Sequence, residues 1–277
     1  MDQKNTNENN VGKNMEIRKI RNDVNYKRER LVRVIVQMRD GRTSTGTGFF
    51  ISEDGEILTC AHVISGTELR NLKAIDYKVG PNAGVNIVNT NSIEQANNVD
   101  QIEHAKFLNY LTQSIMSLQI ELSNGERAMA EIKKIDEEFD VALIKIVKNE
   151  GLGVNGNGKE TPFFLLDDEY IPEYDESTFF CGFQMTGGYE NPTQYPFSIN
   201  RAVVSAIPLV AVAGGRYEHI QLNSINLGGN SGAPLFIEGS NTVIGMINGN
   251  MNWLTNIPLC IAYATSLKLI KEKTDIL

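Results

Sequence analysis

The chain has 277 residues, of which 41% are hydrophobic and 22% charged, and its formal net charge is −8. This composition is typical of a globular protein, and the length fits one large domain or two small ones. The negative charge argues against binding to nucleic acid through its phosphates, and no apolar run in the sequence is long enough to span a membrane.

Residues 1–30 are expected to form an N-terminal extension that is partly disordered. Their first half is polar and rich in Asn, and it lacks the apolar core of a signal peptide. The second half is strongly charged and predicts a short helix or an arm. The three cysteines, Cys60, Cys181 and Cys260, are far apart, which indicates free buried thiols rather than a disulfide framework. Together these features predict a cytoplasmic protein.

Short strands and turn signals dominate the chain from residue 31 onwards. Apolar and β-branched runs predict strands, and the Asp-Gly and Asn-Gly pairs between them predict tight turns. In chain order, the predicted strands cover residues 31–38, 46–52, a stretch that begins at 56, 117–123, 128–135, 141–147, 177–183, 197–207, 217–223, 234–239, 242–248 and 260–267. This pattern favours an all-β sandwich or barrel. The spacing of apolar residues in 266–277 predicts a C-terminal helix.

One region, residues 67–117, interrupts the strand pattern. It is rich in Asn at first and then resembles a helix, and we interpret it as an insertion that ends in a helix. One helical stripe is formed by Ile102, Ala105, Leu108, Leu111, Ile115 and Met116. This helix could cover the β domain or act as a lid or a partner-docking element, and these roles are compatible.

The segment INLGGNSGAPLF, residues 225–236, places Ser231 among glycines directly before an apolar strand. A plain turn would explain the glycines, whereas a nucleophile on a strained loop would need a nearby base. The candidate bases are His62, His104 and His219. His104 lies in the predicted inserted helix and His219 at a predicted strand start, where packing roles are favoured. His62 follows an apolar strand, at a position where side chains reach a cleft.

A histidine base needs a carboxylate that orients it, and Asp140 is the candidate. It is the last acid before the apolar run VALIKI, so its neighbours are expected to be core residues. A carboxylate there is costly unless it is paired, and His62 could be the partner. An α/β-hydrolase would need a histidine after Ser231, and the sequence has none. Cysteine and metal hydrolysis lack suitable motifs, so we expect no metal and no cofactor.

These three residues lie in contexts that resemble the trypsin-like serine protease family, and above all its HtrA/Deg-type branch. The contexts are TCAHV around His62, FDVALIKI around Asp140 and GGNSGAPLF around Ser231. The resemblance covers roughly residues 31–271 and leaves out the extension and the insertion. It implies a chymotrypsin-like fold of two six-stranded antiparallel β-barrels within a domain of residues 31–277. A PDZ domain, which HtrA-type proteins usually carry, is not expected here.

The resemblance also implies a serine endopeptidase that acts through an acyl-enzyme intermediate. Ser231 would attack the peptide carbonyl, His62 would carry the proton, and Asp140 would orient the imidazole. The expected oxyanion hole is formed by the loop residues Gly229, Asn230 and Ser231.

The expected substrate pocket contains no acidic residue, so the resemblance predicts an uncharged, small aliphatic residue before the cleaved bond. The pocket residues implied are Ile225, Asn226, Asn248, Gly249, Asn250 and Ile261.

Two departures from the family pattern bear on activity. Ala233 replaces the second glycine that usually follows the serine, and its methyl group could crowd the loop. Asn230 replaces the aspartate that secreted digestive members pair with a new N-terminus, so activation by such cleavage is not expected. The alternative is therefore a catalytically silent pseudoprotease that binds peptides or a partner. In either case a regulatory protein could act through the extension or the insertion.

Overall fold

The computed structural model describes residues 23–66, 109–111, 113–147, 161–185, 196–212, 215–250 and 261–277. Most of the extension and most of the insertion lie outside these residues, as do His104 and Cys260. Of Asn250, only the main chain is described.

The first half of the described chain forms a closed barrel of six antiparallel strands. The strands are β1 (Leu31–Met38), β2 (Thr43–Phe50), β3 (Glu56–Thr59), β4 (Ile115–Glu121), β5 (Arg127–Asp136) and β6 (Val141–Ile146). They follow the order β1-β2-β3-β6-β5-β4 around the barrel. Buried side chains alternate with more exposed ones along β5 up to a bulge between Ile132 and Lys134, which is the period expected of a strand with one face in a core.

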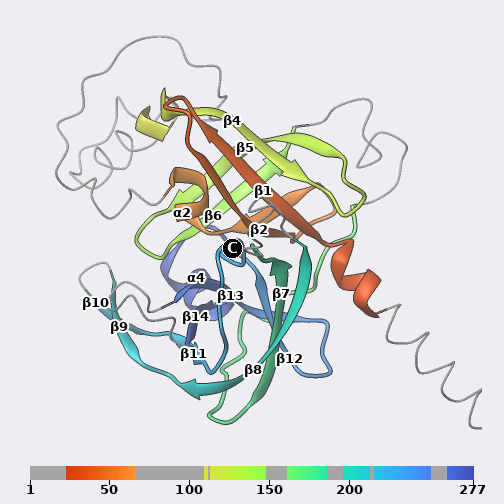
Figure 1. Cartoon of the computed structure of the whole chain (residues 1–277). Coiled ribbons are helices and arrows are strands. Elements are labelled where there is room, and N and C mark those ends of the chain that lie inside the picture. Colours follow the sequence, from red (N-terminus) through yellow and green to blue (C-terminus); the bar gives the residue numbers. More distant parts are fainter. Residues whose placement is uncertain are drawn as a thin grey trace, which may run out of the picture.

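The second half forms another closed six-stranded barrel. Its strands are β7 (Ser177–Phe183), β8 (Phe197–Ala206), β11 (Ile220–Leu222), β12 (Pro234–Ile237), β13 (Val243–Asn250) and β14 (Ala262–Ser266). They follow the order β11-β14-β13-β12-β7-β8, and every pair is antiparallel. Figure 1 shows the first barrel in the upper half of the molecule and the second in the lower half. The predicted all-β fold with two six-stranded barrels is confirmed.

A short helix follows one strand of each barrel. Helix α2 (Ala61–Ser65) follows β3 directly, and α4 (Leu267–Lys273) follows β14. The side chain of Ser266 caps α4 by accepting a hydrogen bond from the amide of Leu269. The predicted C-terminal helix is thus confirmed, although it ends at Lys273. No helix among the described residues has the length and apolar character that a membrane span requires.

The predicted C-terminal end of the helix in the insertion was wrong. Residues 109–111 and 113–114 are helical, but Ile115 and Met116 belong to β4. Ile115 is fully buried and Met116 is exposed, so the side chains alternate as in a strand. Pairing of β4 with β1 and β5 closes the first barrel, and this tertiary pairing outweighs the apparent helical spacing.

Another correction concerns the region before Ser231. The predicted strand 217–223 is divided at His219, with β10 (Gly215–Glu218) before it and β11 after it. β10 pairs with β9 (Leu209–Val212), a strand that the sequence patterns did not predict, in a separate two-stranded sheet. The amide of His219 still donates to the carbonyl oxygen of Pro208, in register with the β9–β10 pairing, and from Ile220 the chain pairs with the second barrel instead.

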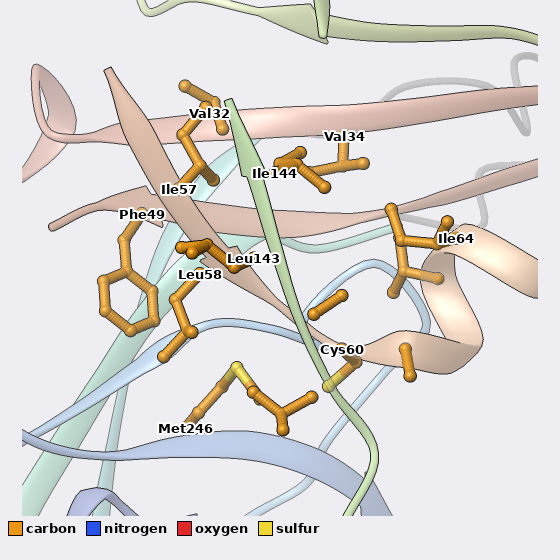
Figure 2. Close-up of a cluster of buried hydrophobic side chains, with 14 of the residues drawn as sticks. Val32, Val34, Phe49, Ile57, Leu58, Cys60, Ile64, Leu143, Ile144 and Met246 are labelled. Atoms are coloured by element: carbon orange, nitrogen blue, oxygen red, sulfur yellow. The ribbon is translucent and has the colours of Figure 1, made fainter. Parts of the chain in front are cut away.

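A continuous apolar core joins the two barrels. Met246 from β13 and Phe236 from β12 belong to the same buried cluster as Leu58 and Cys60 of the first barrel. Figure 2 shows Met246 beneath the side chains that β2, β3 and α2 contribute. Because the core is shared, the ends of β3 and β13 are held at a fixed distance, and this fixes the region where the candidate residues lie.

Candidate active site

His62 lies in the first turn of α2, directly after the buried strand β3. Cys60 precedes the helix in an extended conformation, and Ala61 and Val63 are buried beside His62. The side chain of His62 keeps 30% of its surface exposed. A rigid, buried support therefore presents an imidazole that solvent and ligands can reach.

Asp140 faces His62 from the turn between β5 and β6. Its carboxylate accepts from the His62 main-chain amide at 2.9 Å. The imidazole Nδ1 lies 2.8 Å from one carboxylate oxygen and 3.0 Å from the other. A carboxylate only accepts hydrogen bonds, so Nδ1 carries the proton and Nε2 is left as the basic nitrogen.

The turn that carries Asp140 has an unusual backbone. Asp140 has a φ of 56°, in the left-handed region that Asp tolerates better than most residues. The carboxylate of Asp136 accepts from the amide of Phe139 at 2.8 Å, and Phe139 is buried. These contacts fix the turn so that the Asp140 carboxylate points back to α2. Strained backbone of this kind recurs at functional sites.

Ser231 lies in the loop before β12, and the first barrel holds this loop in place. The amide of Thr47, on β2, donates to the carbonyl oxygen of Ser231 at 2.8 Å. A methyl group added to Gly46 would lie 2.9 Å from this oxygen and 2.5 Å from Val63. The main chain of Ser231 therefore packs against the strand that also contacts Val63 of α2, the residue after His62.

The hydroxyl of Thr47 makes further contacts with the same loop. It donates to the carbonyl oxygen of Gly229 at 2.7 Å and accepts from the amide of Phe183 at 2.9 Å. The Thr47 carbonyl in turn accepts from the hydroxyl of Thr59 at 2.7 Å. Thr47 is fully buried, so these hydrogen bonds are shielded from water.

Two glycines give the serine loop its shape. Gly229 and Gly232 have φ angles of 93° and 88°, which residues with a side chain rarely adopt. A methyl group on Gly232 would also collide with the carbonyl of Thr47. Between them, the amide of Asn230 donates to the carbonyl of Leu227 at 3.3 Å. Within the described chain, the amides of Gly229 and Ser231 have no hydrogen-bond acceptor.

Ala233 and Asn230 are both accommodated in this loop. Ala233 is fully buried, and a glycine stands opposite it at position 182 on β7. A methyl group at Gly182 would lie 3.1 Å from the Ala233 methyl and 2.7 Å from the Thr47 hydroxyl. The buried Asn230 side chain donates to the neutral amide of Gln184 at 3.2 Å. The extra methyl of Ala233 thus occupies space that Gly182 leaves open.

Comparison with known protein families shows which family the chain belongs to. A family model described as a trypsin-like peptidase domain matches residues 46–246, which is more than half of the chain. The chain belongs to the trypsin-like peptidase family. The match spans both barrels and contains all three candidate residues.

Individual relatives point to one branch of this family. The chain is 25% identical over 201 residues to "Serine protease HTRA4" of Mus musculus, covering 70% of this chain and 27% of the relative. It is 24% identical over 204 residues to "Serine protease HTR4" of Bos taurus, covering 71% of this chain and 28% of the relative. The chain thus spans little more than a quarter of the curated relatives it matches. The resemblance to HtrA-type trypsin-like proteases is confirmed.

The predicted pocket residues of this peptidase lie on three segments, namely the serine loop, the end of β13 and the residue before β14. The side chain of buried Asn226 donates to the carbonyl of Gly249 at 3.0 Å, which joins the serine loop to the end of β13. Asn248 donates to the hydroxyl of Thr265 on β14 at 2.7 Å. Among the described residues, a methyl group on Gly249 would meet no atom within 4 Å, so no described side chain fills this edge. Ile225 is half exposed, Ile261 is partly buried before β14, and Asn250 ends β13.

The cysteines described in the structure are not nucleophiles. Burial and the nearby Asp140 carboxylate raise the pKa of Cys60 well above its usual value. Burial raises the pKa of Cys181 to about 12. Since only the thiolate is a strong nucleophile, neither thiol acts as a nucleophile at neutral pH. His219, in contrast, is buried between β10 and β11, and burial lowers its pKa.

The structure adds residues that sequence patterns did not single out. Thr47, Gly182 and Thr59 all contact the serine loop from strands far away in sequence. Thr47 belongs to the motif GTGFF, but the spacing of that motif does not predict that Thr47 contacts the serine loop. Met185 was also missed, and its amide donates to the carbonyl of Gly228 at 2.7 Å.

Proposed function

We propose that the chain is a serine endopeptidase in which Ser231, His62 and Asp140 form the catalytic triad. The observation that carries the proposal is the His62–Asp140 pair, which leaves Nε2 as a base, next to the strand that holds Ser231. Family membership supports hydrolysis of protein or peptide substrates.

In the first half of the reaction, the Ser231 hydroxyl attacks the carbonyl carbon and Nε2 of His62 accepts its proton. The Asp140 carboxylate stabilises the imidazolium that forms and keeps its proton on Nδ1. The imidazolium then protonates the leaving amine, and the acyl group stays on Ser231. In the second half, His62 activates a water molecule in the same way, and hydrolysis frees the serine.

The amides of Gly229 and Ser231 are the proposed donors to the developing oxyanion. The predicted third member, Asn230, contributes by shaping the loop, because its own amide donates to Leu227. Each oxyanion donor is worth on the order of 100- to 1000-fold in rate, since it is fixed before the reaction begins. The contacts of Thr47 with both ends of this loop supply that rigidity.

For the substrate, we propose an uncharged, small aliphatic residue before the cleaved bond. The pocket positions carry no acid, and Gly249 leaves space at its edge. Ile225, Leu227 and Met185 expose apolar side chains on and beside the serine loop. Such a surface binds apolar substrate side chains and disfavours lysine or arginine.

Peptide-library cleavage tests this proposal. The full chain, the Ser231→Ala variant and a peptide library are incubated, and the products are identified by mass spectrometry. We expect cleavage after small aliphatic residues by the wild-type chain alone. Cleavage mainly after arginine would refute the specificity. Peptide binding without cleavage by either chain would favour the pseudoprotease alternative. Full, unregulated cleavage of casein would argue against a narrow specificity controlled through the extension or the insertion.

A further inference from the structure

Three side chains with metal-binding atoms lie close together at the histidine. The Cys60 Sγ, a ring nitrogen of His62 and a carboxylate oxygen of Asp140 all lie within 4.8 Å of one another, and the ring nitrogen nearest to Asp140 is Nδ1. Cys60 is the residue before α2, His62 is in α2, and Asp140 faces both from the β5–β6 turn. The triad uses two of these groups and gives no role to the thiol.

Thiolate, imidazole and carboxylate are the ligands that Zn²⁺ prefers in proteins. With Zn–S near 2.3 Å and Zn–N near 2.0–2.1 Å, two ligand atoms on one tetrahedral ion lie about 3–4 Å apart. The His62 Nδ1 and Asp140 oxygen are 2.8 Å apart, and the Cys60 Sγ now donates to the Ile247 carbonyl at 3.3 Å. Small rotations of these side chains would therefore suffice to coordinate an ion.

We propose that Cys60, His62 and Asp140 form an inhibitory site for a thiophilic divalent cation, Zn²⁺ being the physiological candidate. This inference rests on the proposed function, because it concerns the regulation of the same histidine. Three protein ligands would leave the fourth position of the ion to a water molecule. No resident metal is needed for catalysis, so the ion acts only as an inhibitor.

The inhibition follows from the two nitrogens of His62. The ion takes the lone pair of Nδ1, so the proton on Nδ1 leaves and the imidazole carries its proton on Nε2 instead. The thiol proton of Cys60 passes to solvent as the sulfur becomes a thiolate. A protonated, neutral Nε2–H cannot accept the proton of Ser231. The ion also separates His62 from Asp140, which removes the group that stabilises the imidazolium.

The surroundings allow the ion to enter. The side chains of His62 and Asp140 are 30% and 24% exposed, whereas Cys60 is fully buried. The ion would thus enter past the two partly exposed side chains and bind the thiolate of the buried cysteine behind them. The two negative charges of thiolate and carboxylate balance the charge of the cation in this partly buried place.

Cadmium binding tests the site directly and does not depend on activity. Cd²⁺ is titrated into the full-length chain by isothermal titration calorimetry, with Zn²⁺ as competitor, and the thiolate-to-cadmium absorption in the ultraviolet is recorded in parallel for the chains that keep Cys60. We expect one Cd²⁺ per chain in the wild type. Mutation of residues that only hydrogen-bond to metal ligands already weakens metal binding by about 10- to 100-fold. Loss of a direct ligand in Cys60→Ser should therefore weaken Cd²⁺ binding at least about tenfold. The matched controls Cys181→Ser and Cys260→Ser should bind as the wild type does.

A second arm links binding to inhibition. The rate of labelling by a fluorophosphonate is measured for each chain with and without Zn²⁺, and each chain is compared with its own metal-free rate. We expect Zn²⁺ to suppress labelling of the wild type and both control variants, and chelation to restore it. The Cys60→Ser variant should keep most of its rate at the same Zn²⁺ concentration.

The outcomes separate this inference from the proposed function. If Cys60→Ser binds Cd²⁺ as tightly as the wild type, the inference is wrong even where labelling is normal. If no chain is labelled without metal, the proposed function fails, while the Cd²⁺ titration still decides the site. Should Cys60→Ser fail to fold, His62→Gln replaces a partly exposed ligand, and unchanged Cd²⁺ affinity in that variant would overturn the inference equally.

Discussion

The main-chain amide of Thr47 donates to the carbonyl oxygen of Ser231 at 2.8 Å, so a strand of the first barrel holds the serine loop of the second. The side chain of the same threonine contacts Gly229, where an oxyanion donor is proposed. The relative position of His62 and Ser231 therefore depends on one buried residue that touches no substrate. Thr47 is a positioning residue in this account.

Replacing Thr47 with valine should loosen the serine loop. The change keeps the shape but leaves the carbonyl of Gly229 and the amide of Phe183 without their buried partner, at a cost of about 1–3 kcal/mol in unfolding free energy. Misplaced loop donors should lower kcat by about 10- to 100-fold with little change in KM. Urea unfolding and steady-state kinetics measure the two effects. Thr47→Ser keeps the hydroxyl and should recover most of kcat, and equal losses in both variants would contradict this role.

Asp140→Asn should reduce kcat by about 10⁴-fold, because an amide at this position favours the wrong tautomer of the histidine. The fold should persist, since asparagine also tolerates the left-handed backbone of Asp140. Kinetics and circular dichroism check the two parts. Glu138→Gln, a change in an exposed neighbour, provides the control and should behave as the wild type. A folded Asp140→Asn variant with near-normal kcat would show that another group orients His62.

Gly249→Val should narrow the substrate pocket without destabilising the barrel. An added Cβ there meets no atom of the described residues within 4 Å, and no positive φ opposes the change. The pocket would lose the space of about one or two methylene groups. The ratio of kcat/KM for smaller over larger aliphatic residues before the cleaved bond should therefore rise by about 10- to 200-fold. Peptides that differ only at this residue measure the shift. An unchanged preference, with normal stability, would place Gly249 outside the pocket.

His219 should make the fold less stable in mild acid. Burial lowers its pKa in the folded protein, so the unfolded chain binds the proton more readily. Its contribution is fully present above the unfolded pKa, about 6.5, and is lost as the pH falls from there towards the folded value. The urea midpoint of His219→Gln should fall less than that of the wild type between about pH 7.5 and pH 5.5. Parallel losses in both chains would show that another group controls the acid sensitivity.

The sequence predicted strands correctly where the local pattern of apolar residues agrees with the pairing of the strand in the barrel. Residues 31–38 are apolar and β-branched and form β1 with the expected bounds. The pattern failed at Ile115 and Met116, because a short apolar run fits both a helix and a strand, and only pairing with β1 decides between them. His219 likewise lies where the chain leaves the β9–β10 sheet for the second barrel, and no local strand pattern predicts that change of partner.

For the candidate site, the sequence indicated the candidate catalytic residues but not the contacts that position them. His62 and Asp140 were selected from their positions beside apolar runs, and the structure brings their side chains into contact. Thr47 and Cys60 act through contacts with residues more than 70 positions away in sequence. Such contacts follow from the closure of the barrels, which spacing along the chain does not encode.

The most direct test of the catalytic triad is to react the full-length chain with a fluorophosphonate and map the modified residue by mass spectrometry. This reagent captures a serine only when a base activates it within a suitable oxyanion hole. The account predicts a single phosphonylated residue, Ser231, with labelling abolished in Ser231→Ala and strongly slowed in His62→Gln. Labelling of a folded wild-type chain at another residue, or at the same rate in His62→Gln, would contradict it.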